Sequence, residues 1–170
     1  MTVLFYKTIA YDASRKGFYS PSWRDFLWTP EVVVAQCEKC APTGEIGLDC
    51  TCGIYGSPNI ETLEEYHKYP NSIVAIMNAY GCFDIWTGPS DLAAFYVIRC
   101  WGAKIVGILT TDLTTKYNIT GQRAQSAVLA MDKFNVSGEQ LYLAKEMIRQ
   151  SWLKTIDIDP SMPYKEKLDE

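Results

Sequence analysis

The sequence predicts an α+β fold: a mostly antiparallel sheet, a short helix after a cysteine-rich segment, and a C-terminal helix. Hydrophobic residues make up 48% of the 170 residues and charged residues 21%, which is typical of a packed globular chain. Runs of β-branched and aromatic residues between turn-forming residues indicate strands. An apolar period of 3.6 residues near the C-terminus indicates a helix.

The N-terminal region predicts a β-hairpin followed by a short strand. Residues 3–11 and 17–20 are rich in β-branched and aromatic side chains, and residues 12–16 between them have the composition of a turn. Residues 31–36 are apolar enough for a short buried strand. Three strands are therefore expected before the first cysteine.

The middle of the chain predicts one helix and further strands. Ser57 can cap the free amides of a helix that starts at Pro58 and ends at Pro70. Residues 72–80 and 93–109 are apolar and β-branched, so they predict strands. Gly102 is expected to mark a bend or bulge between two strands within the second segment.

The C-terminal third contains one segment of ambiguous structure and one predicted helix. Residues 121–134 suit a helix by propensity but also the start of a strand. Ser137 and Gln140 have the spacing of a capping box before a helix. Its apolar face is predicted from the residues at helical spacing, namely Leu141, Ala144, Lys145, Ile148 and Trp152.

Charge and hydropathy exclude several classes of protein. The net charge of -4 and the pI near 5.1 disfavour general binding of the nucleic-acid backbone. The N-terminus lacks the pattern of a secretory signal, which favours a cytoplasmic location. In the most apolar stretch, residues 92–109, Arg99 and Lys104 would be costly at the centre of a bilayer, so a membrane span is not expected.

The most specific motif is a cluster of cysteines, Cys37-Glu-Lys-Cys40 followed by Cys50-Thr-Cys52. Four thiols within such a short segment match the tetrahedral ligand set of a structural zinc ion, and Gly44 and Gly47 let the intervening loop fold back. We therefore predict a zinc knuckle at 37–52 inside a single α+β domain of residues 1–155, with an extended tail at 156–170. A disulfide pair and cysteines without metal remain the alternatives.

The other two cysteines and the single histidine are assigned structural roles. Cys82 and Cys100 lie in apolar surroundings, so they are expected in the core rather than at the metal. His67 is flanked by charged residues at helical spacing, which predicts an exposed helix face. Serine-histidine, cysteine-histidine and metal-hydrolase schemes would all depend on that one residue. No phosphate-loop, dinucleotide-binding or zinc-protease motif is present.

Several segments resemble a group of small bacterial and phage proteins with a Cys-x-Cys-Gly-Ile-Tyr-Ala knuckle. The resemblance covers roughly residues 1–130, and Gly56 stands where that group has Ala. It implies a cytoplasmic α+β domain with a cysteine-rich knuckle and no established reaction. The matching segments are residues 17–20, Trp28, residues 35–37, residues 50–56, residues 100–106 and residues 121–124.

Function is predicted to be binding rather than catalysis. A zinc-stabilised accessory protein that binds a partner protein or a small anionic ligand needs no catalytic group, and a phage inhibitor of a host system would be one case. Arg123 after Gly121 could clamp an anion, and Tyr55 between glycines could stack on a ligand ring. The alternative is an enzyme that acts on a nucleotide or peptide.

Overall fold

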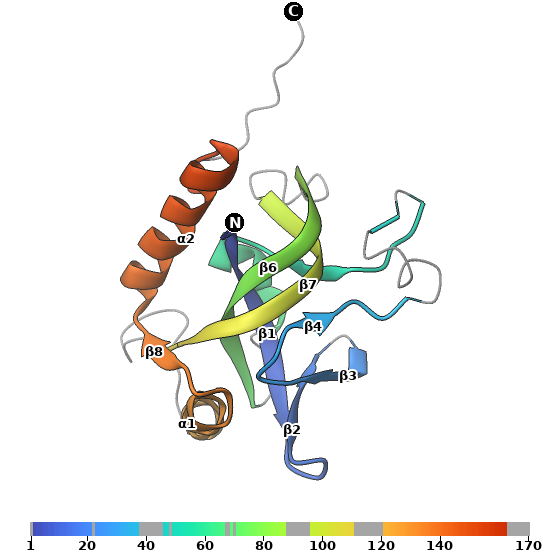
Figure 1. The fold of residues 1–170 in the computed structure, drawn as a ribbon. Coiled ribbons are helices and arrows are strands. Elements are labelled where there is room, and N and C mark those ends of the chain that lie inside the picture. Colours follow the sequence, from blue (N-terminus) through green and yellow to red (C-terminus); the bar gives the residue numbers. More distant parts are fainter. Residues whose placement is uncertain are drawn as a thin grey trace, which may run out of the picture.

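The computed structural model describes residues 2–21, 23–37, 46–47, 49–66, 69, 71–87, 96–110 and 121–162, and it confirms the α+β fold (Figure 1). Within these residues the strands form one eight-stranded sheet. The elements are β1 (Leu4–Asp12), β2 (Gly17–Ser20), β3 (Trp23–Trp28), β4 (Val33–Val34), β5 (Ile54–Gly56), the 3₁₀ helix η1 (Ile60–Tyr66), β6 (Ser72–Thr87), β7 (Tyr96–Leu109), α1 (Gln122–Phe134), β8 (Ser137–Glu139) and α2 (Leu141–Ile156).

The sheet is mostly antiparallel, as the sequence predicts; the described strands β7 and β8 form a parallel pair, which was not predicted. Its main order is β3-β2-β1-β6-β7-β4, and β5 also pairs with β7. The residue after β5 pairs with β1, because Tyr6 and Ser57 exchange two backbone hydrogen bonds of 2.7 and 3.1 Å. Strands β1, β6, β7 and β5 therefore form a closed ring around part of the core.

Gly56 lies where this ring closes. A Cβ atom there would overlap the ring of Phe5 and come within 2.5 Å of the Tyr6 carbonyl oxygen. Phe5 and Tyr6 are both fully buried, so neither can move aside at low cost. The glycine is required for close approach of β5 to β1.

We expect Gly56→Ala to lower the free energy of unfolding by about 1–3 kcal/mol, the usual cost of overpacking a core. Gly107→Ala in β7 is the matched control, because its new methyl would meet its nearest neighbour at an ordinary 3.4 Å. Urea denaturation of the three proteins measures the difference. Equal stability of Gly56→Ala and the wild type would show that the ring does not close as tightly as described.

The N-terminal hairpin is confirmed, and Ala10 to Asp12 pair with Gly17 to Tyr19.

The predicted bend or bulge at Gly102, which would separate two strands, is wrong. Strand β7 is continuous through that residue. The register shift lies opposite it in β6, between Tyr80 and Phe83. Gly81 adopts the left-handed φ of 74° there, so glycine in the neighbouring strand supplies the irregularity.

Two further sequence predictions need correction. Of the buried strand predicted at 31–36, only the two residues of β4 form a strand. Val34 is 40% exposed, so β4 is a short strand at the edge of the sheet rather than a buried one. The helix predicted from Pro58 is the 3₁₀ helix η1, which begins at Ile60. The Ser57 hydroxyl accepts a hydrogen bond from the Asn59 amide and donates to the Tyr96 carbonyl, so it holds a turn rather than capping an α-helix.

The ambiguous segment 121–134 is a helix, α1. The C-terminal helix is confirmed, but the capping box is wrong: Ser137 lies in β8, and Gln140 caps α2 without a side-chain hydrogen bond. Residues 137–139 pair with β7, so they are in a strand before the helix starts.

Helix α2 is attached to the start of β1 by two hydrogen bonds. The Ser151 hydroxyl accepts a hydrogen bond from the Leu4 amide, and the Trp152 indole donates one to the Leu4 carbonyl. These contacts fix α2 along the edge of β1.

The start of the predicted tail is structured. Helix α2 runs through Ile156, Asp159 accepts a hydrogen bond from Arg149 at 3.0 Å, and Pro160 is buried. The remaining residues of the predicted tail, 163–170, lie outside the described residues. Among the described helices, none has the length and apolarity needed to cross a membrane.

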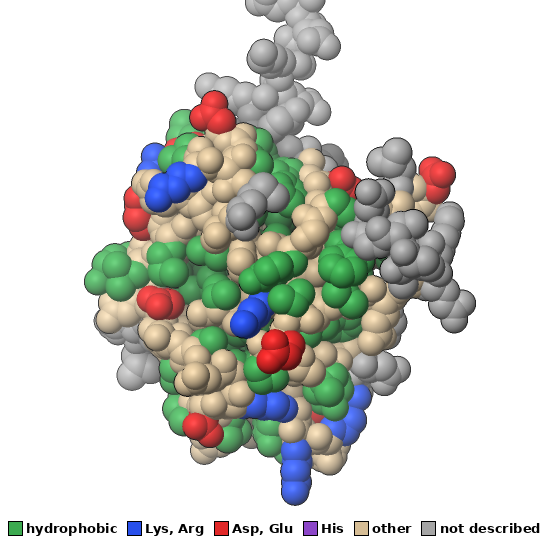
Figure 2. All heavy atoms as spheres, viewed as in Figure 1, with side chains coloured by type: hydrophobic (Ala, Val, Ile, Leu, Met, Phe, Trp, Pro, Cys, Tyr) green, Lys and Arg blue, Asp and Glu red, His purple; other side chains and the backbone are tan. Residues whose placement is uncertain are grey.

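One face of β6 and β7 retains apolar surface. Tyr80 and Val106 are each 38% exposed, whereas Ala103 and Ile105 on the opposite face are buried, as expected for alternating strand residues. Figure 2 shows hydrophobic side chains reaching the surface between scattered charged ones on the side of the molecule seen in Figure 1. The sheet thus has a buried side and a partly solvated side.

Candidate metal centre and adjoining cavity

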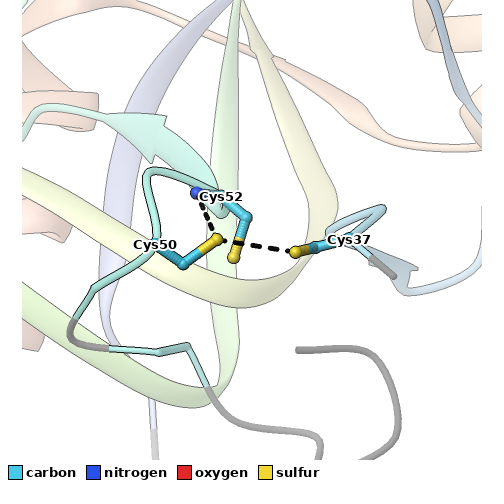
Figure 3. Close-up of side chains that lie close together, drawn as sticks. All are labelled: Cys37, Cys50 and Cys52. Atoms are coloured by element: carbon cyan, nitrogen blue, oxygen red, sulfur yellow. Dashed lines mark hydrogen bonds between the residues drawn. The ribbon is translucent and has the colours of Figure 1, made fainter. Parts of the chain in front are cut away.

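Three of the four predicted ligands lie together. The sulfur atoms of Cys37, Cys50 and Cys52 are all within 4.8 Å of one another, and the Cys37 and Cys50 sulfurs are 3.5 Å apart (Figure 3). Zn–S bonds of 2.3 Å at tetrahedral angles place two sulfurs about 3.8 Å apart. The three thiols could therefore hold a metal ion.

The described cysteines are not joined in this arrangement. No disulfide joins the cysteines in the described part of the chain, and the 3.5 Å separation is far longer than an S–S bond of about 2.05 Å. The Cys52 amide also donates to the Cys50 sulfur at 3.5 Å. Cys40, the fourth predicted ligand, lies outside the described residues.

Arg99 fixes the loop that carries two of these cysteines. Its guanidinium donates to the carbonyl oxygens of Cys50 and Cys52, and it pairs with the Asp84 carboxylate at 2.5 Å. The Arg99 residue is 7% exposed although it is a charged side chain in the sheet. The hydrogen bond to Asp84 is the main cause of the raised pKa of Arg99. The cation therefore holds the ligand loop against β7.

The two remaining cysteines have different environments. Cys100 is fully buried, as predicted, and burial raises the pKa of its thiol to about 12. The prediction that Cys82 is a core residue is wrong, because Cys82 is exposed at the β6 bulge. Its sulfur accepts a hydrogen bond from the Ile46 amide at 3.1 Å. The bulge at Gly81 turns this residue out of the core.

A cavity of about 740 Å³ adjoins the metal centre. One wall is the segment from Thr51 to Ser57, which includes the candidate metal ligand Cys52. The other walls come from β1, β2, β3 and η1, and the apolar lining residues include Phe26, Trp28, Ile54, Leu63 and Val97. No acidic side chain is among the described residues that line it. The volume suits a small organic ligand.

Lys7 places an amine in this apolar cavity. Its Nζ atom donates to the Tyr55 carbonyl at 2.8 Å and lies 6.0 Å from the centre of the Trp28 ring. Burial lowers the pKa of Lys7 to about 8, and the electrostatic interaction with Cys100 opposes this shift. The described lining residues offer Lys7 no carboxylate partner, and a cation in such an apolar site indicates a ligand-binding residue.

Thr8 follows Lys7 in β1, between two points where that strand is attached to its neighbours. Thr8 is 4% exposed, and its hydroxyl has no hydrogen-bond partner among the described residues. On one side along β1, Tyr6 is bridged to Ser57, and on the other side Ala10 pairs with Tyr19 of β2. Thr8 is among the residues that line the cavity between these two attachments.

The predicted ligand residues fall in different places. Tyr55 lines the cavity, but its hydroxyl donates to the Thr51 carbonyl within its own loop. Arg123 is partly buried on α1 and is not among the residues that line the cavity. His67 lies outside the described residues. The structure therefore brings Tyr55, but not Arg123, to the cavity beside the cysteines.

Sequence reasoning missed Lys7 and Arg99. Both are single cations within apolar strand segments, Leu-Phe-Tyr-Lys-Thr-Ile-Ala and Tyr-Val-Ile-Arg-Cys-Trp. An isolated charge in an otherwise buried strand needs a partner or a functional role, so this pattern is the signal that could have identified them.

Comparison of the chain with protein-family models, curated proteins and solved structures finds no match. The resemblance to proteins with a Cys-x-Cys-Gly-Ile-Tyr-Ala knuckle therefore stays a prediction.

Proposed function

We propose that the protein is a zinc-stabilised, non-catalytic binding protein that takes up a small anionic ligand with an apolar body. The observation that carries this proposal is Lys7, a cation in an apolar cavity whose described lining has no acidic side chain. The ligand's negative group would pair with the Lys7 ammonium, and its apolar part would contact Phe26 and Trp28.

Zinc is the metal that best fits the chemistry of the site. Thiolate ligands select soft or borderline ions, and zinc prefers the tetrahedral arrangement that Cys37, Cys50 and Cys52 approach. Cys40 is the proposed fourth ligand. When bound, the ion would hold the loop that forms one wall of the cavity.

Titration with 1-anilinonaphthalene-8-sulfonate tests the proposal, because this probe is an aromatic anion whose fluorescence rises in apolar sites. We expect saturable binding to the wild type and binding ten- to a hundredfold weaker to Lys7→Met, as for loss of a charge-assisted contact. Affinity should also fall as the pH rises from 7 to 9.5, since Lys7 loses its proton near pH 8.

Arg123→Ala is the matched control, because it removes a cation that does not line the cavity. Its affinity for the probe should equal that of the wild type, and thermal melts should show that every variant is folded. Weaker binding to Arg123→Ala together with unchanged binding to Lys7→Met would assign the anion site to α1 instead and contradict the proposed cavity.

A further inference from the structure

Lys7 has a second chemical capacity, as a nucleophile. The titratable side chains among the described lining residues are Lys7, Cys52 and Tyr55, and Cys52 belongs to the metal centre. Lys7 is the one amine among them. Its hydrogen bond to the Tyr55 carbonyl uses a single N–H, so the neutral amine keeps its lone pair available to a ligand.

The surroundings of Nζ suit an aromatic reactant. Phe26 and Trp28 line the cavity as a tilted pair with ring centres 5.0 Å apart. Nζ lies 6.0 Å from the centre of the Trp28 ring, which also stabilises a positive charge at this nitrogen. A flat ring beside Trp28 would thus carry a substituent within reach of the amine.

Burial also makes the reactive form of this amine available at neutral pH. With its pKa at about 8, roughly a tenth of Lys7 is neutral at pH 7, compared with about 0.03% of a lysine of ordinary pKa. The neutral fraction is thus larger by about 300-fold. A weaker base is also a weaker nucleophile, so the gain in rate is expected to be smaller than this ratio.

We propose that Lys7 is a covalent attachment site for small aromatic aldehydes, which it binds reversibly as an imine. The Nζ lone pair forms a bond to the carbonyl carbon, and the carbonyl oxygen leaves as water with the two protons from nitrogen. No electron donor or acceptor is consumed. The inference rests on the cavity of the proposed function but does not depend on anion binding there.

Reductive trapping tests this inference. The full-length protein is incubated with benzaldehyde and sodium cyanoborohydride at pH 7.5, and peptide mass spectrometry follows the initial modification of each lysine. We expect Lys7 to be modified about tenfold or more faster than Lys145 and Lys154, which are exposed. Excess 1-anilinonaphthalene-8-sulfonate should protect Lys7 but not the two exposed lysines.

Lys7→Arg is the matched variant, since arginine keeps the charge but forms no stable imine under these conditions. It should lose the fast-reacting position while the exposed lysines react as before. Modification of Lys7 no faster than Lys145 would overturn the inference, even if the sulfonate probe binds. Fast modification of Lys7 without probe binding would support it and contradict the proposed anion site, so the two failures are distinguishable.

Discussion

Replacement of Cys50 by serine is expected to release the metal and cause a large loss of stability. Cys50 belongs to the cluster with Cys37 and Cys52, and the wild type is expected to hold about one zinc ion per chain. If free zinc exceeds the dissociation constant a thousandfold, binding contributes about 4 kcal/mol to the stability of the folded state. For a chain of this length, that loss lowers the melting temperature by roughly 8–16 °C.

Metal analysis and thermal melting of reduced protein measure both effects. Cys82→Ser is the matched control, because Cys82 is exposed and is not part of the cluster. It should keep the metal and the wild-type melting temperature. A full equivalent of zinc in Cys50→Ser, or no metal in freshly prepared wild type, would contradict the proposed zinc site.

Replacement of Arg99 by methionine is expected to weaken metal binding without touching a ligand atom. The change removes the donor to the Cys50 and Cys52 carbonyls, so the loop loses its attachment to β7. Groups that orient metal ligands typically contribute ten- to a hundredfold in affinity. Stability should also fall by about 2–3 kcal/mol, less than for a fully buried ion pair because Asp84 is 46% exposed.

Competition with a chromophoric chelator measures the zinc affinity of this variant. Arg149→Met makes the same substitution at a more exposed ion pair, where the Arg149 side chain is 37% exposed. That control should keep the wild-type zinc affinity and change stability by less than about 0.5 kcal/mol. Equal zinc affinity of Arg99→Met and Arg149→Met would show that Arg99 does not position the cysteine loop.

Local patterns predicted the fold class and much of the element order. The hairpin of β1 and β2 depends on two β-branched runs around one turn, and α2 depends on apolar residues at helical spacing. Both signals lie within a few residues along the chain, so they can be recognised without knowledge of distant contacts. The same holds for the cysteine motif, whose spacing predicted that Cys37, Cys50 and Cys52 come together.

The errors arise where a distant strand decides the local structure. The residue type and spacing of Ser137 are typical of a helix cap, but its pairing with β7 places it in β8. Glycine is typical of a bend or bulge within a strand, but Gly102 pairs with neighbouring strands on both sides and stays within β7. The irregularity lies at Gly81 of β6 instead. Hydrogen bonds to neighbouring strands outweigh the weak preferences of single residues at these positions.

The sequence by itself determined the α+β class, the antiparallel hairpin and the ligand chemistry of the cysteines, because each depends on residue type and short spacing. Only the tertiary structure decided that Tyr6 and Ser57 close a ring of strands and that Lys7 lies in a cavity beside the cysteine loop. Lys7 and Tyr55 are 48 positions apart, and their hydrogen bond requires β5 to lie beside β1. Such long-range contacts follow from how the whole sheet curves and pairs, which no local pattern encodes.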